Sequence, residues 1–329
     1  MTLVILGLAF IVLTAVGMPI SFAVGVASVI ATLLLPGVDN ATIVQRMLTA
    51  INTFPLLAVI FFVFAGTLMA RGGIARRLVN MAEVLVGWLP GSLAQIVCVA
   101  SMFFGGVTGS AVAEVSSIGA MMIPAMVKDG YSRRFATAIV LTAATMGPII
   151  PPSIGMIVYA HVAGTVSIAA LFLAGVVPGV MIGLSLMVAS FIHGKLYHQK
   201  ELPKLTPRER IVRIFDGLAG VFTMVIILGG IISGVFTATE AGAAACVYAM
   251  FLTMVVYREI KIQDLPAIIC VTNSVVMLLI ATCSVYAWIL TYENLPNTLA
   301  DNFFNLIQSK WAFLLILNIF CSSSACSLT

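Results

Sequence analysis

Long apolar runs separated by short polar or glycine-rich stretches dominate this chain. We expect them to form membrane-spanning helices at 2–17, 19–36, 50–70, 135–163, 168–193, 214–235, 240–257 and 265–290, and another apolar run starts at Trp311. The first 36 residues could instead form one long kinked helix, because the turn at Gly17-Met18-Pro19 carries no basic residue. Of 329 residues, 61% are hydrophobic and 9% charged, against about 25% charged in soluble domains. We therefore predict an all-α polytopic membrane protein without a separate soluble domain.

The apolar stretch 92–127 differs from the others because Gly105-Gly106-Val107-Thr108-Gly109-Ser110 divides it. Arms of about 15 residues are short for a helix that rises 1.5 Å per residue across a bilayer. We therefore predict a re-entrant hairpin. Non-helical backbone persists at membrane depth only where protein or a water-filled cavity surrounds it. The tip of this hairpin is consequently a candidate ion or substrate site.

The basic residues predict one orientation in the membrane. Four clusters occur near Arg76, Arg133, Arg208 and Arg258, each separated from the next by two crossings or by the hairpin. All four then share one face, which the positive-inside rule makes cytoplasmic. Because these charges sit in short loops, the net charge of +4 does not indicate nucleic-acid binding. The segment 74–86 alternates charged and apolar positions, which fits an amphipathic helix in the cytoplasmic interface or a simple loop helix.

The tip residues have the chemistry of an ion site. Gly105, Gly106 and Gly109 free the backbone, and Thr108 and Ser110 add hydroxyls. Unwound carbonyls with hydroxyl oxygens suit Na⁺, and a helix N-terminus near Ala111 suits a carboxylate. Alternatively, the small residues pack helices closely, since Gly105 and Gly109 have the G-x-x-x-G spacing.

A second candidate lies in the middle of span 135–163. Gly147-Pro148-Ile149-Ile150-Pro151-Pro152-Ser153 contains three prolines, which remove backbone donors and break a helix. The carbonyls of Met146–Ile150 then need other partners. A break at mid-depth beside the hairpin would complete an ion site, and the alternative is a packing kink satisfied by neighbouring helices.

Two acidic residues in apolar surroundings predict different roles. Glu114 lies one helical turn beyond Ser110, at a depth where a carboxylate is costly and usually functional. It could pair with the tip hydroxyls, support an ion, or satisfy backbone donors freed by the tip. Glu240 follows Thr237 in a T-x-x-E capping box, so we predict that it caps the helix 240–257.

The order of elements predicts an inverted repeat. Three spans precede the hairpin in residues 1–194, which also hold the broken helix (135–163) and a connecting helix (168–193). After a charged cytoplasmic linker at 195–213, residues 214–320 repeat three spans in the opposite orientation. This plan is common in secondary transporters. The sequence has no P-loop, no H-E-x-x-H and no dinucleotide fingerprint, so we predict no enzymatic activity and no cofactor other than a coupling ion.

Four stretches together resemble the large membrane subunit of TRAP transporters, the tripartite ATP-independent periplasmic carriers of organic acids. They are Phe54–Gly66, Gly109–Glu114, Gly147–Ser153 and Phe236–Ala241. Ile60 and Ala238 stand where the family tends to have proline. The resemblance implies an inner-membrane permease with an elevator motion, and as partners a small four-helix membrane subunit, a periplasmic substrate-binding protein, a small carboxylate and membrane lipid.

The resemblance also implies where ions and substrate bind. Na⁺ would bind between the hairpin tip and the broken helix, and substrate would bind between two hairpin tips. In this sequence the expected site consists of Gly105, Gly106, Thr108, Gly109, Ser110, Glu114, Gly147, Pro148, Pro151, Pro152 and Ser153, with Thr108, Ser110 and Ser153 as candidate Na⁺ ligands. The substrate could be a C4-dicarboxylate, a sugar acid or a sialic acid.

The last residues depart from the family pattern. After Phe320 the chain changes to a Ser/Cys-rich tail, 321–329, where the family continues with a second hairpin and a second broken helix. We expect a truncated or frameshifted second repeat and a chain that is inactive by itself. The alternatives are a remnant of a disrupted transporter gene and a standalone ion–carboxylate symporter. An intramembrane protease is a remote alternative, since no catalytic pair has suitable spacing.

Overall fold

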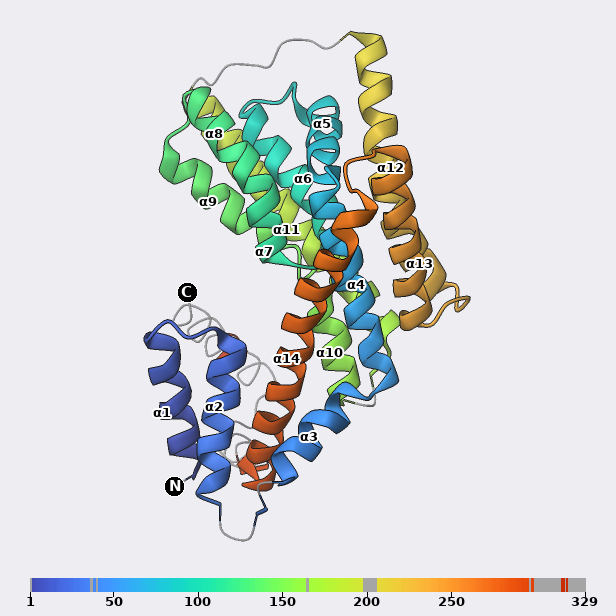
Figure 1. The fold of residues 1–329 in the computed structure, drawn as a ribbon. Helices are drawn as coiled ribbons and strands as arrows, with labels where there is room; N and C mark the ends of the chain where they lie inside the picture. Colours follow the sequence, from blue (N-terminus) through green and yellow to red (C-terminus); the bar gives the residue numbers. More distant parts are fainter. Residues whose placement is uncertain are drawn as a thin grey trace. The chain divides into compact units, whose positions relative to one another are not determined.

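The computed structural model describes residues 2–35, 38–39, 41–163, 166–197, 206–295, 297–298, 315–316 and 318. These residues form helices joined by short turns, without any strand (Figure 1). The helices are α1 (Thr2–Ala15), α2 (Ile20–Leu33), α3 (Ala41–Ile51), α4 (Phe54–Arg71), α5 (Ile74–Val86), α6 (Ser92–Thr108), α7 (Ala111–Glu114), η1 (Val115–Gly119), α8 (Ala120–Lys128), α9 (Arg133–Ala144), α10 (Ile154–Ala163), α11 (Ile168–Leu196), α12 (Pro207–Ile232), α13 (Ala238–Met250), η2 (Phe251–Val256), η3 (Ile262–Asp264) and α14 (Leu265–Tyr292).

The chain divides into two compact units. The first comprises Met1–Asn52 and Met277–Thr329, and the second comprises Thr53–Val276. In the first unit, α1 and α2 lie side by side as an antiparallel pair (Figure 1), so the alternative of one long kinked helix is wrong. Their core includes Leu6, Ala27 and Ala31, which pack with Val285 and Ile289 of α14. This unit also contains α3, an amphipathic helix that the hydrophobic pattern did not predict.

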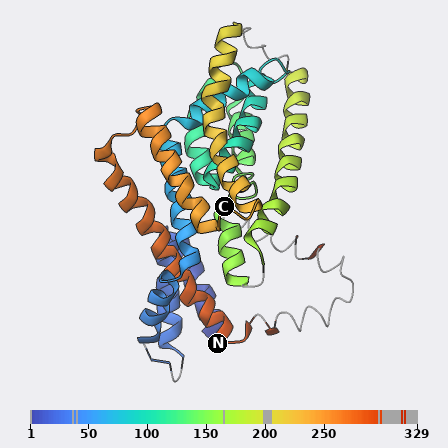
Figure 2. The ribbon, with the colours of Figure 1, turned by 90° about the vertical axis from the view of Figure 1, so that its right-hand side faces the viewer.

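The second unit contains the predicted hairpin and the predicted broken helix. In it α4 packs along α13, α5 packs against α6 and α12, and α6 contacts α9 and α11 (Figure 1 and Figure 2). The thiol of Cys246 on α13 donates to the Phe61 carbonyl of α4, at 2.9 Å, and joins one of these pairs. The predicted repeats, 1–194 and 214–320, have other boundaries than these two units. The inverted repeat therefore stays a prediction.

Among the described residues, five helical segments are long and apolar enough to cross a membrane: Ala111–Lys128, Ile168–Leu196, Pro207–Ile232, Ala238–Val256 and Ile262–Tyr292. This confirms an all-α polytopic membrane protein. The hairpin arms are longer than expected, with 17 residues in α6 and 18 in Ala111–Lys128. The second arm has the length and hydropathy of a crossing segment, so the re-entrant character of the hairpin stays a prediction.

The amphipathic helix expected at 74–86 exists as α5, but its apolar face does not meet lipid. Ile74, Leu78 and Met81 are buried, and the helix packs against α6 and α12. Glu83 forms an ion pair with Arg213 of α12, with 2.5 Å between Glu83 Oε2 and Arg213 Nη1. The interfacial interpretation is therefore wrong, because protein rather than membrane surface covers the apolar stripe.

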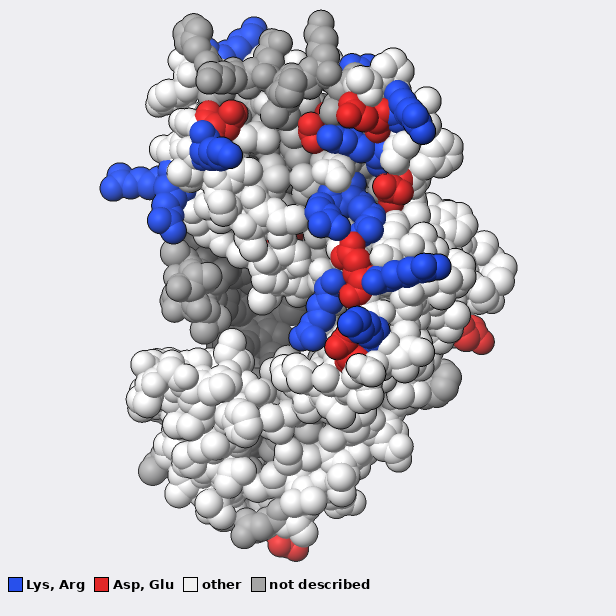
Figure 3. Space-filling view, turned by 45° about the horizontal axis from the view of Figure 1, so that its top comes forward, with Lys and Arg blue, Asp and Glu red and all other residues white. Residues whose placement is uncertain are grey.

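Charged side chains concentrate in the second unit. Every described Lys and Arg except Arg46 belongs to it, and Figure 3 shows acidic side chains lying between basic ones on one of its faces. The capping box at the start of α13 is present as predicted. The Thr237 hydroxyl accepts from Glu240 N at 3.3 Å, and the Glu240 carboxylate accepts from Thr237 N at 2.8 Å. Glu240 therefore serves as a helix cap.

Candidate functional site

The hairpin turns at two residues only. α6 continues to Thr108, Gly109 adopts the left-handed conformation with φ +62°, and α7 begins at Ala111. The Ser110 side chain caps α7 by accepting from Ala113 N at 3.4 Å. The prediction of an unwound tip from Gly105 onward is thus wrong for Gly105, Gly106 and Thr108, whose backbone is helical. Small residues here permit close packing and leave the helix intact.

The break in the predicted long helix is present. α9 ends at Ala144 and α10 begins at Ile154. The Met146 carbonyl accepts from Ile149 N at 3.0 Å and Ile150 N at 2.7 Å. The Ser153 hydroxyl donates to the Pro148 carbonyl at 2.6 Å. The Met146 and Pro148 carbonyls are therefore both satisfied inside the loop.

The tip and the break touch each other. A Cβ added at Gly109 would clash with the Pro152 carbonyl, and one added at Gly105 would lie 2.9 Å from Gly147 Cα. A Cβ at Gly147 would in turn lie 3.2 Å from the Ser110 carbonyl carbon. The two motifs, which are about 40 residues apart in sequence, thus form one continuous site, and their glycines are required because backbone meets backbone.

Glu114 lies at this contact. Its side chain is fully buried, and a Cβ added at Gly147 would lie 3.0 Å from its Oε2. The hydroxyl of Ser101 on α6 faces the carboxylate, yet neither oxygen reaches hydrogen-bond geometry with a described residue. Glu114 therefore does not satisfy the backbone donors of the tip. An unpaired buried carboxylate is costly, and a cation at this position would compensate it.

The three hydroxyls expected to bind Na⁺ all have local partners. Thr108 is buried and donates to the Phe104 carbonyl at 3.1 Å. Ser153 is buried, donates to Pro148 and accepts from Met156 N at 3.3 Å. A hydroxyl group that donates its proton in a hydrogen bond still has lone pairs on its oxygen that can bind a cation. The site thus combines hydroxyl oxygens, loop carbonyls and one carboxylate, which are the hard oxygen ligands that alkali and alkaline-earth cations prefer.

Several glycines that support this site were not singled out from the sequence. A Cβ at Gly66 of α4 would lie 3.1 Å from Thr108 Cα, so α4 packs directly on the end of α6. On α11, a Cβ at Gly175 would lie 2.5 Å from the Ile149 carbonyl, and Gly179 packs against Ile150. The four-residue spacing of Gly175, Gly179 and Gly183 is the sequence signal that could have found this surface.

Comparison with known proteins assigns the chain to a family. Residues 8–329 match the DctM component of the tripartite ATP-independent periplasmic transporter. The chain belongs to this family. It is 41% identical over 315 residues to the uncharacterized protein YgiK of Salmonella typhimurium, covering 94% of this chain and 72% of that protein.

Two relatives have named transport functions. The C4-dicarboxylate TRAP transporter large permease protein DctM of Pseudomonas aeruginosa is 39% identical, with 88% of this chain and 68% of that protein covered. The sialic acid TRAP transporter large permease protein SiaM of Vibrio cholerae is 37% identical, with 92% and 71% covered. This chain is therefore a TRAP transporter large permease, a multi-pass inner-membrane protein of a family of transporters and not of enzymes.

Proposed function

We propose that the chain forms the Na⁺-coupled path for a small organic carboxylate in a binding-protein-dependent importer. The observation that carries this proposal is the contact between the hairpin tip and the break, where the buried Glu114 carboxylate has no hydrogen-bond partner among the described residues. A cation held there would neutralise Glu114 and tie the tip to the break. Binding of the ion would thereby be coupled to the position of the hairpin.

The substrate class follows from the relatives and from the helix start at Ala111. Relatives are named for C4-dicarboxylates, sialic acid and 2,3-diketo-L-gulonate, all of which are organic acids. α7 begins directly after the Gly109–Ser110 turn, and a helix N-terminus favours an anion. We propose that the substrate carboxylate binds beside this turn.

We also propose the partners that the tripartite architecture implies, a small membrane subunit and a periplasmic binding protein. The relatives from Pseudomonas aeruginosa and Vibrio cholerae are named as large permeases of TRAP transporters. We favour these partners over a standalone symporter, because residues 8–329 match the DctM component of a tripartite transporter.

The test is uptake of labelled succinate, sialic acid and gluconate into proteoliposomes that hold the chain with a small membrane subunit and a matching binding protein. We expect uptake only with an inward Na⁺ gradient and added binding protein. The Pseudomonas aeruginosa relative at its full length serves as the reference. Equal uptake with a K⁺ gradient would overturn the Na⁺ coupling, and uptake without binding protein would favour a standalone symporter.

Binding of Na⁺ is tested separately by thermal unfolding of the purified chain in NaCl and in choline chloride. A ligand that binds the folded state at about 100 times its Kd stabilises it by roughly 2.7 kcal/mol. We expect a higher melting temperature in NaCl. The same melting temperature in both salts would contradict a Na⁺ site in this chain, whatever the uptake assay shows.

A further inference from the structure

The joint between α4 and α5 has an unusual backbone. α4 ends at Arg71 and α5 begins at Ile74, and between them Gly73 adopts the left-handed conformation with φ +71°. A Cβ at Gly72 would clash with the Thr253 side chain, and a Cβ at Gly73 would clash with the Glu259 carboxylate. η2 and the segment that follows it therefore pack against the joint, which favours glycine at both positions.

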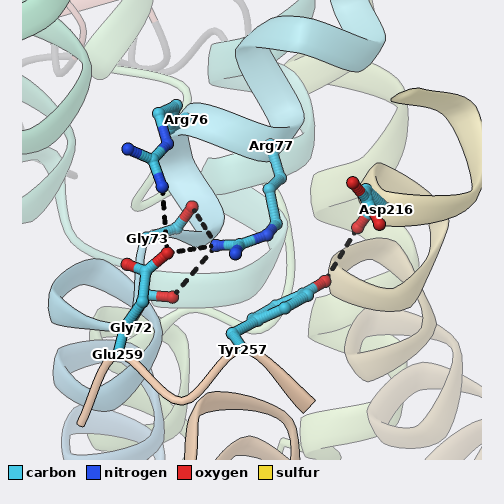
Figure 4. A network of polar contacts seen from close by, with 7 residues as sticks. All are labelled: Gly72, Gly73, Arg76, Arg77, Asp216, Tyr257 and Glu259. Carbon is cyan, nitrogen blue, oxygen red and sulfur yellow. Dashed lines mark hydrogen bonds and ion pairs between the residues drawn. The ribbon is translucent and has the colours of Figure 1, made fainter. Parts of the chain in front are cut away.

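Three charged residues fasten this joint (Figure 4). Arg77 Nη1 donates to Glu259 Oε1 at 2.8 Å and to the Gly73 carbonyl at 3.0 Å. Arg76 Nη2 donates to the same carboxylate oxygen at 3.0 Å. A carboxylate that accepts from two guanidinium groups forms strong charge-assisted hydrogen bonds. We call Arg76, Arg77 and Glu259 the joint clamp.

A tyrosine extends the joint clamp to α12. The Arg77 guanidinium lies 3.5 Å from the centre of the Tyr257 ring, and the Tyr257 hydroxyl donates to the Asp216 carbonyl at 2.8 Å (Figure 4). Burial raises the pKa of Tyr257 to about 12. The hydroxyl therefore keeps its proton, and this hydrogen bond persists throughout the physiological pH range.

An open cavity of about 300 Å³ lies between residues of the joint clamp and residues of the second hairpin arm. Gly73, Arg76 and Glu259 line one side, and Ser116, Ser117 and Met121 of the second hairpin arm line the other. The serines belong to η1, a π-helical turn from Val115 to Gly119. Such turns are rare in proteins overall, and those that occur are often found at functional sites. Ser116 is exposed at this open cavity, so the arm has room to shift there.

We propose that the joint clamp is a positioning device, which holds the α4–α5 joint and thereby keeps the second hairpin arm out of the cavity. α5 packs against α6, the first arm, so a change at the joint is passed to the hairpin. Release of the clamp lets Ser116 and Ser117 move toward the space beside Arg76. The link from this movement to transport rests on the proposed function, whereas the movement itself does not.

The side-chain exposures predict unequal contributions within the joint clamp. The Arg77 side chain is 16% exposed and that of Arg76 is 62% exposed. Exposed ion pairs contribute little, because solvent screens them. Loss of Glu259 or Arg77 should therefore release the joint, and loss of Arg76 should change it only slightly.

The test is the rate at which a maleimide modifies Ser117→Cys in the full chain, in membranes, with the native cysteines replaced. We expect Glu259→Gln to change this rate about fivefold, Arg77→Lys less, and Arg76→Gln less than twofold. The matched control is Glu83→Gln. Glu83 lies on α5, like the arginines of the joint clamp, but away from the cavity, and the change removes its ion pair with Arg213 of α12. It should leave the rate unchanged.

Ionic strength provides a second readout. Raising the salt concentration should shift the rate in the parent toward that of Glu259→Gln, because salt screens the clamp, and should have no effect in Glu259→Gln itself. The proposal is overturned if Glu259→Gln leaves the rate unchanged or if Glu83→Gln changes it equally. Labelling needs neither Na⁺ nor substrate. A failure of uptake would therefore count against the proposed function alone, and unchanged labelling would count against the clamp alone.

Discussion

Gly109 and Glu114 show how single residues determine the candidate site. Gly109 allows the hairpin to turn within two residues and lets its backbone touch the Pro152 carbonyl. Glu114 places an unpaired carboxylate directly behind that contact. Both residues could be identified in the sequence, but the surroundings that make them important come from a segment about 40 residues away.

Substituting Gly109 with alanine should reduce Na⁺-dependent uptake at least tenfold without preventing membrane insertion. An added Cβ strains the left-handed backbone, by about 1–2 kcal/mol, and also clashes with the Pro152 carbonyl. Gly130→Ala is the matched control, since Gly130 has φ +94° and open space around it. Uptake and the amount of protein in the membrane are measured for both. Equal losses would show that backbone strain, and not contact with the break, is responsible.

Glu114→Gln should raise the Na⁺ concentration for half-maximal uptake at least tenfold. The amide keeps the shape of the carboxylate but cannot neutralise a cation. The same change replaces a buried carboxyl group that has no ion pair among the described residues, so the melting temperature without Na⁺ should stay equal or rise. A lower melting temperature together with an unchanged Na⁺ requirement would assign Glu114 a structural role instead.

At the scale of elements, helix ends are set by local chemistry and helix neighbours are not. The T-x-x-E pattern identified the cap of α13, although the helix begins at Ala238 and not at 240 as expected, and the prolines placed the break between α9 and α10. A second capping box, formed by Thr206 and Glu209 at the start of α12, was overlooked although it follows the same rule. In contrast, the amphipathic pattern of α5 could not show whether lipid or protein covers its apolar face.

Thr237→Ala should destabilise the protein by about 1 kcal/mol, the usual effect of losing an N-cap. Its hydroxyl and backbone make three hydrogen bonds with Glu240, and no part of the candidate site is nearby in sequence. Thermal unfolding in detergent measures the loss, and uptake per folded protein should stay the same. A changed Na⁺ requirement in this variant would contradict the assignment of Glu240 as a cap.

At the scale of the whole molecule, the orientation in the membrane follows from charge. We expect an impermeant maleimide to label Lys128→Cys from the cytoplasmic side and Ser233→Cys from the periplasmic side, in a chain without native cysteines. Both positions are exposed in the second unit. Right-side-out and inverted vesicles distinguish the two faces. Labelling of both positions from the same side would contradict the positive-inside assignment and the inverted repeat built on it.

The sequence by itself determined the class of protein, the positions of most helices, the break at the prolines and the turn of the hairpin. These features depend on local properties: hydrophobic length, missing backbone donors and glycine conformations. Only the tertiary structure decided that tip and break form one site, that Glu114 is unpaired there, and that α5 is covered by protein. The joint clamp belongs to the same group, because Arg77 and Glu259 are 182 residues apart. Such contacts depend on which apolar faces pack together, and no local pattern in a uniformly apolar chain specifies that choice.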